Sequence, residues 1–363
     1  MRFALQSGIW SLEFGILSFT PQNILIINFG QIGDVILSLP AFKAVRLQFP
    51  RARITAMIGK SGAEIIEISG YADERIVVDR VKLRDGNKLA SIKEIIKISK
   101  DVRRRKFDFI VDLHSLYETN LLGFFSGARH RLYANRENRS LDFLGKFSPR
   151  PPREDKSKHL TEHYLSVLAP LGIESAERFA EILPRRTDVE SVENLLQNYN
   201  VGDKKLVGLF PGAGHASRRW RLENFARLAE LLSEDKDLRT IVFLGPEEKD
   251  LRREVKEKFP ASAIVLDDLT LLQFAAALSK LQVLISNDTG AVHIGAVAGT
   301  SVVLIMDKEA PTTYLPLTEK LRVVRSGRLD EITVEEVFDA IEEILNSHKI
   351  FVNETSNYKS LPK

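Results

Sequence analysis

The stretch 283–293 holds the residue types in this chain that are best suited to bind an anion. An apolar run, VLISN, leads into Asp288, Thr289 and Gly290, and a helix of small residues that includes His293 is predicted to follow. Free N–H groups and the positive end of the helix dipole favour a phosphate at such a helix start. We therefore interpret the turn as a phosphate site in which Thr289 and Gly290 donate through their amides. The alternatives are that Asp288 simply caps the helix and that His293 is structural.

A second polar turn follows the first strongly apolar run, at 23–29, and ends in Gly33 and Asp34. Asp34 is a candidate general base, because a base must lie within hydrogen-bond reach of the hydroxyl that it deprotonates. Aspartate is also a good helix N-cap, and spacing alone does not choose between the two roles. The turn lacks the third glycine and the acidic ribose partner of a dinucleotide fingerprint.

A third turn combines backbone amides with two cations. Gly212, Ala213 and Gly214 follow the apolar run 205–210, and Arg218 and Arg219 come shortly after. A guanidinium can hold a diphosphate through two parallel hydrogen bonds. The pair predicts a diphosphate clamp, with a solvated surface pair as the alternative.

Two more apolar runs end in polar residues. The run 107–113 ends at Asp112 and His114, which could form an acid and base pair or serve structural roles. The run 240–244 leads into an acidic turn with Glu247 and Glu248, where the choice between the two glutamates is ambiguous.

The elements that must position these residues follow one pattern. Apolar runs alternate with helical patterns in two series, which predicts βαβ units and two doubly wound parallel sheets of the α/β class. Ligands of such sheets bind at the carboxyl ends of the strands. All of the polar turns lie at those ends, so we expect a cleft between two domains to collect them.

The alternation also divides the chain. We expect an N-terminal extension (1–21), a first Rossmann-like domain (22–184), a linker (185–204), a second Rossmann-like domain (205–348) and a tail (349–363). The segment 129–158 breaks the pattern with three prolines and with nine Lys or Arg against four Asp or Glu, and is predicted to be a basic loop. Pro40 is expected to kink or restart the helix that follows Asp34, and the last helix is expected over 333–346.

Composition excludes several classes of protein. The chain has no cysteine, which rules out disulfides and thiolate metal sites and fits a reducing compartment. A net charge of +3 is too small to argue for nucleic acid. No apolar run is long enough to span a membrane, and residues 1–20 are interpreted as an extension, with a surface-lying membrane segment as the alternative. We find no metal-ligand spacing and no Gly-x-Ser-x-Gly elbow.

Taken together, the motifs resemble glycosyltransferase family 9, the bacterial lipopolysaccharide heptosyltransferases. The resemblance runs from residue 23 to about 345 and is specific because the motifs occur in order. They are IGDV with LPA after it, FD leading to DLH, PGA with RRW and ENFA, LG, and NDTG followed by His293. The resemblance implies a GT-B fold, an ADP-activated heptose donor, inversion at the anomeric carbon, and neither a metal nor a cofactor.

The resemblance also implies roles for single residues. Asp34 matches the proposed base of the family, Asp288 the residue near the donor's sugar hydroxyls, and Glu247 the glutamate that binds ribose. Arg218 stands where the family usually has lysine, and Ala213 stands where a hydroxyl is common, so two donor contacts are in question. Gly33, Asp112 and His114 are candidates for the acceptor side.

The predicted activity is transfer of heptose from ADP-heptose to the inner core of lipopolysaccharide. The expected place is the cytoplasm, at the inner face of the inner membrane, with peripheral membrane contact and no nucleic acid partner. The basic segment 129–158 could meet the phosphates and acidic sugars of the acceptor. Alternatives are a transferase or epimerase that uses another nucleotide sugar, and a catalytically silent protein that binds a sugar nucleotide.

Overall fold

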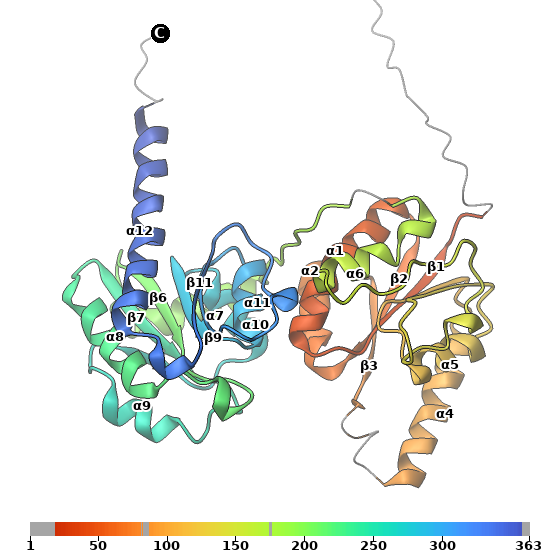
Figure 1. The fold of residues 1–363 in the computed structure, drawn as a ribbon, viewed down its shortest axis with the longest axis horizontal. Helices are drawn as coiled ribbons and strands as arrows, with labels where there is room; N and C mark the ends of the chain where they lie inside the picture. The colour runs from red at the N-terminus through yellow and green to blue at the C-terminus, as the bar shows by residue number, and fades with distance from the viewer. Residues whose placement is uncertain (1–18, 81, 83–86, 174–175, 358–363) are drawn as a thin grey trace, which may run out of the picture.

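The structure of the protein is a computed structural model, which describes residues 19–80, 82, 87–173 and 176–357. Two parallel sheets lie side by side, each covered by helices on both faces (Figure 1). The sequence predicted this α/β architecture. The predicted extension at 1–21 falls almost entirely outside the described residues.

The first sheet has five strands in the order β3-β2-β1-β4-β5. Their bounds are β1 Asn23–Asn28, β2 Arg53–Gly59, β3 Glu74–Val78, β4 Phe109–Asp112 and β5 His130–Tyr133. Leu25, Ile26 and Ile27 of the central strand are fully buried, as expected for a parallel sheet covered on both sides. Strand β5 lies inside the segment 129–158, so the prediction of a loop there was wrong for its first part. The short run HRLY gives too weak an apolar signal.

Helices cover both faces of this sheet. Helices α1 (Ile32–Gln48), α2 (Ala63–Ser69) and α6 (Leu160–Ser166) pack on one face, and α4 (Lys88–Arg104) and α5 (Tyr117–Phe125) lie on the other. Helix α1 continues through Pro40 without a restart. Pro40 is buried, and apolar packing on the sheet holds the helix around it.

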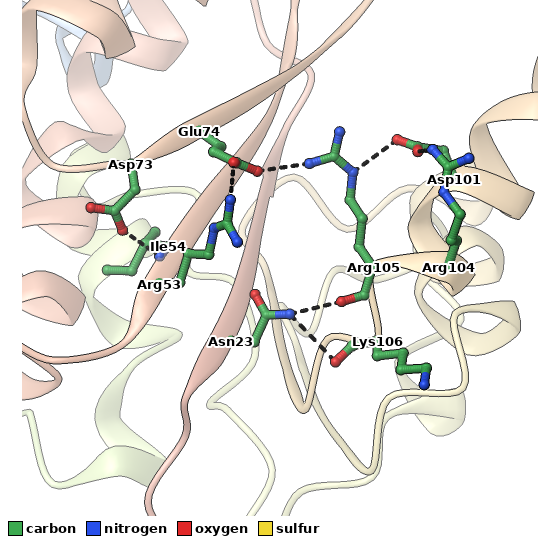
Figure 2. Close-up of polar contacts among 9 residues, drawn as sticks. All are labelled: Asn23, Arg53, Ile54, Asp73, Glu74, Asp101, Arg104, Arg105 and Lys106. Atoms are coloured by element: carbon green, nitrogen blue, oxygen red, sulfur yellow. Dashed lines mark hydrogen bonds and ion pairs between the residues drawn. The ribbon is translucent and has the colours of Figure 1, made fainter.

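Ion pairs connect the amino-terminal ends of the strands in this sheet to the C-terminal end of α4 (Figure 2). Glu74 of β3 pairs with Arg53 of β2 and, at 2.8 Å, with Arg105, which also contacts Asp101 at 2.9 Å. The side-chain amide of Asn23 donates to the Arg105 carbonyl at 2.8 Å. These contacts anchor the C-terminal half of α4 on the sheet.

The second sheet has six strands in the order β11-β10-β9-β6-β7-β8. They are β6 Lys205–Phe210, β7 Leu238–Phe243, β8 Ile264–Leu266, β9 Val283–Asn287, β10 Ser301–Asp307 and β11 Leu321–Ser326. Its helices are α7 Arg186–Gln197, α8 Leu222–Glu234, α9 Arg252–Lys258, α10 Leu271–Leu278, α11 Gly290–Val297 and α12 Val334–Asn357.

Two differences from the sequence prediction concern helices of this domain. Helix α12 continues to Asn357, beyond the end expected at residue 346 and into the stretch expected as a tail. The stretch expected as a linker, 185–204, contains α7, which packs against α10. The two domains meet where α1 and α2 face α11 and α10 (Figure 1), and one cluster of buried apolar residues runs from the first domain into the second.

Candidate active site

A cleft of about 700 Å³ lies where the two domains meet at the carboxyl ends of their strands. The first domain contributes the start of α1, from Gln31 to Asp34, and the second contributes the start of α11 and the segment around Arg218. Of the residues predicted for the site, the cleft is lined by Gly33, Asp34, Arg218, Asp288, Thr289, Gly290 and His293. Residues that are far apart in the chain are therefore brought together, but only part of the predicted set lines the cleft. The predicted residues outside its lining are Gly212, Ala213, Gly214, Arg219, Glu247, Asp112 and His114.

Asp34 occupies the first turn of α1, half-buried at the cleft wall. One of its carboxylate oxygens accepts the Gln31 N–H at 2.9 Å, so the residue does stabilise the helix start. Burial raises the pKa of Asp34, while the Gln31 N–H and the positive charges of Arg136 and Arg80 oppose this rise. Gly30 makes room for the side chain, because a Cβ atom there would collide with Asp34. The two interpretations of Asp34, helix cap and base, are thus compatible.

The turn at the start of α11 faces Asp34 across the cleft. Thr289 is the N-cap residue and Gly290 is the first residue of the helix, so their N–H groups belong to the set that has no partner within the helix. A Cβ atom on Gly290 would collide with Ile32 of the first domain. This position therefore needs glycine because the domains approach each other closely here.

His293 lies one turn further along α11 and is buried. Burial lowers the pKa of His293 to about 4, so the ring is neutral at pH 7. Its Nδ1 atom has no hydrogen-bond partner among the described residues. A neutral imidazole can donate one hydrogen bond to a phosphate but adds no positive charge.

The two arginines of the predicted clamp lie in different surroundings. The Arg218 side chain is 65% exposed, lines the cleft, and comes within 3.7 Å of the Asp288 carboxylate. Arg219 instead donates to the Ala213 carbonyl at 3.3 Å and pairs with Asp250 at 2.8 Å. Arg218 is placed to meet a ligand, whereas Arg219 holds its own loop.

Asn287, which was not among the predicted site residues, holds two loops of the second domain together. Its side-chain amide donates to the carbonyls of Pro211 at 2.9 Å and Gly212 at 3.2 Å, and its oxygen accepts the backbone N–H of Trp220 at 2.9 Å. The signal available in the sequence was a polar amide at the end of an apolar run. In the structure Asn287 is fully buried, and a buried amide needs hydrogen-bond partners. Asn287 therefore fixes the 211–214 turn beside Asp288.

The acidic turn after β7 has its two glutamates in opposite environments. Glu247 is exposed, while Glu248 is buried and accepts the Gly245 N–H at 2.9 Å. A Cβ atom on Gly212 would collide with the Glu248 side chain, so Glu248 lies directly against the predicted phosphate turn. The ambiguity that the sequence left between these two residues therefore remains, with Glu248 nearer to that turn. In the 211–214 turn itself, Ala213 is buried and Gly214 is exposed.

Asp112 and His114 do not line the cleft. Asp112 is fully buried and accepts hydrogen bonds from the Ser115 N–H at 2.7 Å and the Asn120 amide at 2.8 Å. Burial raises the pKa of Asp112 to about 7 and, with nearby arginines, lowers the pKa of His114 to about 3. This geometry fits the structural alternative, and a contact with the acceptor stays a prediction.

The cleft is also lined by Asp307, the last residue of β10, and by residues of the segment that follows it, including Glu309 and Tyr314. No motif in the sequence marked them, because they come from an irregular connection. Among the described residues, no three His, Asp or Glu side chains gather as a metal site. In the same part of the chain, no helix is long and apolar enough to cross a bilayer.

Comparison with known proteins identifies the family. The sequence pattern of glycosyltransferase family 9 (heptosyltransferase) matches residues 95–339. The chain belongs to glycosyltransferase family 9. The lipopolysaccharide core heptosyltransferase OpsX of Haemophilus influenzae is 20% identical over 84% of either chain.

Solved structures of this family share the fold. The glycosyl transferase family 9 protein of Veillonella parvula superimposes with a TM-score of 0.79 at 23% identity, covering 90% of this chain and 97% of the other. The Escherichia coli heptosyltransferase WaaC with ADP gives a TM-score of 0.71 at 19% identity over 89% of this chain and all of the other. The fold is therefore GT-B, as predicted. The chain is therefore a glycosyltransferase of the heptosyltransferase family. Membership of this family favours glycosyl transfer over the epimerase alternative.

Proposed function

We propose that the protein transfers a heptose from ADP-heptose to an inner-core acceptor of lipopolysaccharide, with inversion of the anomeric carbon. The choice of donor is supported by the ADP bound to the related WaaC, and the choice of acceptor by the name of the related core heptosyltransferase. The observation that carries the proposal is the shared cleft, in which Asp34 lies across from Arg218 and the start of α11.

The reaction needs one proton acceptor and a seat for a departing diphosphate. The Asp34 carboxylate takes the proton of an acceptor hydroxyl, and that oxygen attacks the anomeric carbon on the face opposite ADP. The bond from that carbon to the β-phosphate oxygen breaks, and ADP leaves with the electron pair. Arg218 and the amides of Thr289 and Gly290 stabilise the charge, while neutral His293 donates one hydrogen bond. No metal takes part in this scheme.

The acceptor side of the cleft carries positive charge. Arg80 and Arg136 are close enough to Asp34 to oppose the rise in its pKa, and Arg136 also contacts the His114 carbonyl at 2.8 Å. Together with the basic segment 129–158, these cations favour an acceptor with phosphates or acidic sugars. An acceptor of this kind would place the protein at the cytoplasmic face of the inner membrane.

Activity measurements with purified protein test the proposal. The donor is identified by incubation with ADP-heptose and, separately, with UDP-sugars, in the presence of a core acceptor, followed by detection of free nucleotide and of extended acceptor. We expect release of ADP and extension of the acceptor with ADP-heptose, and neither nucleotide release nor product with the UDP-sugars. Release of UDP instead would identify another donor.

The Asp34→Asn variant tests the base, because asparagine can still accept the Gln31 N–H but cannot take a proton. We expect transfer to fall by about 10²- to 10⁴-fold, the usual contribution of a general base, with ADP binding unchanged. Asp268→Asn, at an exposed position of the second domain, is the control. Equal transfer by wild type and Asp34→Asn would exclude Asp34 as the base. Binding of ADP without transfer in the wild type would favour the silent alternative.

A further inference from the structure

The face of the first domain formed by α4 and α5 exposes an unusual amount of apolar surface. On α4, Ile92, Ile95 and Ile96 are exposed, with Ile92 at 53%. Their spacing of three and four residues puts them on neighbouring positions of one helix face. The core-facing residues of this helix, Ile98 and Val102, belong to its C-terminal half. The turns that carry the isoleucines therefore extend beyond the sheet, and Figure 1 shows α4 projecting from the domain.

Helix α5 contacts α4 and also exposes large apolar side chains. Tyr117, Leu121, Phe124 and Phe125 are exposed, and Phe125 reaches 55%. They follow one another at helical spacing, so the outward face of α5 is apolar and aromatic. Arg131 lies over the Phe124 ring, with 5.4 Å from its guanidinium carbon to the ring centre. Water is a poor environment for so many neighbouring large apolar groups.

Positive charge borders the isoleucines on the same helix. Lys93, Lys97 and Lys100 are exposed and recur at four- and three-residue spacing. Because each residue advances about 100° around a helix, this stripe lies beside the stripe of Ile92 and Ile96. Glu94, which is 3.7 Å from Lys97, lies on the side turned away from those isoleucines. An apolar face flanked by lysines is the pattern of helices that lie in the interface of an anionic bilayer.

We infer that the α4–α5 face, defined by the exposed residues above, docks the protein on an anionic phospholipid bilayer. The choice of a bilayer over a protein partner rests on this charge complementarity and on the proposed function, whose acceptor is a lipid-anchored glycan. Topology adds a second argument. Helices α1, α4 and α5 each begin after the carboxyl end of a strand. The exposed turns of α4 and the start of α1, which carries Asp34, therefore lie on the side of the sheet where the strands end. A bilayer held there presents its headgroups to the side of the domain that carries the base.

Vesicle flotation of the full chain tests the inference without any need for transfer activity. We expect the protein to float with vesicles of phosphatidylglycerol and phosphatidylethanolamine and to stay behind with pure phosphatidylcholine. The double variant Ile92→Glu/Ile96→Glu should lose at least tenfold in apparent vesicle affinity. Leu47→Glu, at a position on α1 that is 70% exposed, is the matched control and should float like wild type.

Charge is tested separately. Lys93→Glu/Lys97→Glu should weaken binding to the anionic vesicles by about tenfold, and Lys236→Glu/Lys249→Glu in the second domain should not. Circular dichroism and the transfer rate on a detergent-solubilised acceptor show whether each variant is folded.

Unchanged flotation of both α4 variants would overturn the inference. So would light scattering that shows a dimer dissociated by Ile92→Glu/Ile96→Glu, together with no vesicle binding by the wild type, since the face would then join two copies of the chain. Failure of transfer with flotation intact would count against the proposed function and leave the docking face standing.

Discussion

Gly33 of the first domain lies directly against His293 of the second. A Cβ atom placed on Gly33 would come within 3.0 Å of His293 Cδ2 and 3.2 Å of Nε2. The neighbouring residue of α1, Asp34, is the proposed base, and His293 is on the helix whose start is the proposed diphosphate seat. The absence of a side chain at position 33 therefore sets how closely the two halves of the site can approach.

The Gly33→Ala variant tests this relationship. The added methyl group must displace the His293 ring or push α1 away from α11, so we expect kcat to fall by tenfold or more while the protein stays folded, since misplacement of about 1 Å can cost about 100-fold. Steady-state kinetics and thermal unfolding provide the measurement. Gly59→Ala is the control, because a Cβ atom there would meet nothing closer than 3.5 Å. Wild-type kinetics for Gly33→Ala would show that the two halves tolerate a wider separation.

The pH dependence of transfer should report on Asp34. A base works when it is deprotonated, and burial raises the pKa of this carboxyl above the ordinary value for aspartate. Activity should therefore fall as the pH drops through this raised pKa, at a higher pH than for an ordinary exposed aspartate. The measurement is kcat/KM against pH over the acid range. Arg136→Gln removes a charge that lowers this pKa, so the acid limb should move further upward. An acid limb that does not move with Arg136 would argue against Asp34 as its source.

Arg218 and Arg219 should separate in function although they are adjacent in sequence. Arg218→Ala removes the exposed cation that lines the cleft, so transfer should fall by about 10²-fold with little change in stability. Arg219→Ala removes contacts to the Ala213 carbonyl and Asp250, which should lower the free energy of unfolding by about 1 kcal/mol. Transfer rates and urea unfolding of both variants provide the comparison. Equal effects on transfer would mean that Arg219 also reaches the diphosphate.

Burial of His293 should make the stability of the protein depend on pH. The pKa of His293 is about 4 in the folded chain against 6.5 when unperturbed, so the unfolded chain binds the proton more tightly. The stabilising contribution is present above pH 6.5 and is lost as the pH falls toward 4, by about 3 kcal/mol in total. Because His114 contributes in the same direction, the test compares urea unfolding of wild type and His293→Leu from pH 7 to pH 4. A constant difference between the two proteins would contradict the assignment.

The sequence predicted the parts of this protein that depend on local pattern. Continuous apolar runs such as 23–28 and 283–287 identified the buried strands, and the polar turns after them identified the cleft. Prediction failed where tertiary contacts decide the structure. Strand β5 is short and half polar and is held by pairing with β4, and α1 runs through Pro40 because packing outweighs the local penalty.

The site shows the same division. Asp34 and the start of α11 could be predicted because a strand end and a helix start specify where they lie. The different surroundings of Arg218 and Arg219, and the burial of Glu248 rather than Glu247, depend on which groups lie opposite them. Sequence spacing cannot show which of two adjacent residues of the same type faces a given group, because that depends on tertiary contacts.

The side chain of Asn287 has a consequence for ligand binding. Its three hydrogen bonds join the 211–214 turn, Trp220 and the strand that leads to Asp288. The proposed donor site is thus held in place by hydrogen bonds within the protein, so binding of a nucleotide there should cost little loop entropy. What is left to be arranged during the catalytic cycle is the separation of the two domains, so the slow motion of this enzyme should be a hinge movement rather than a loop closure.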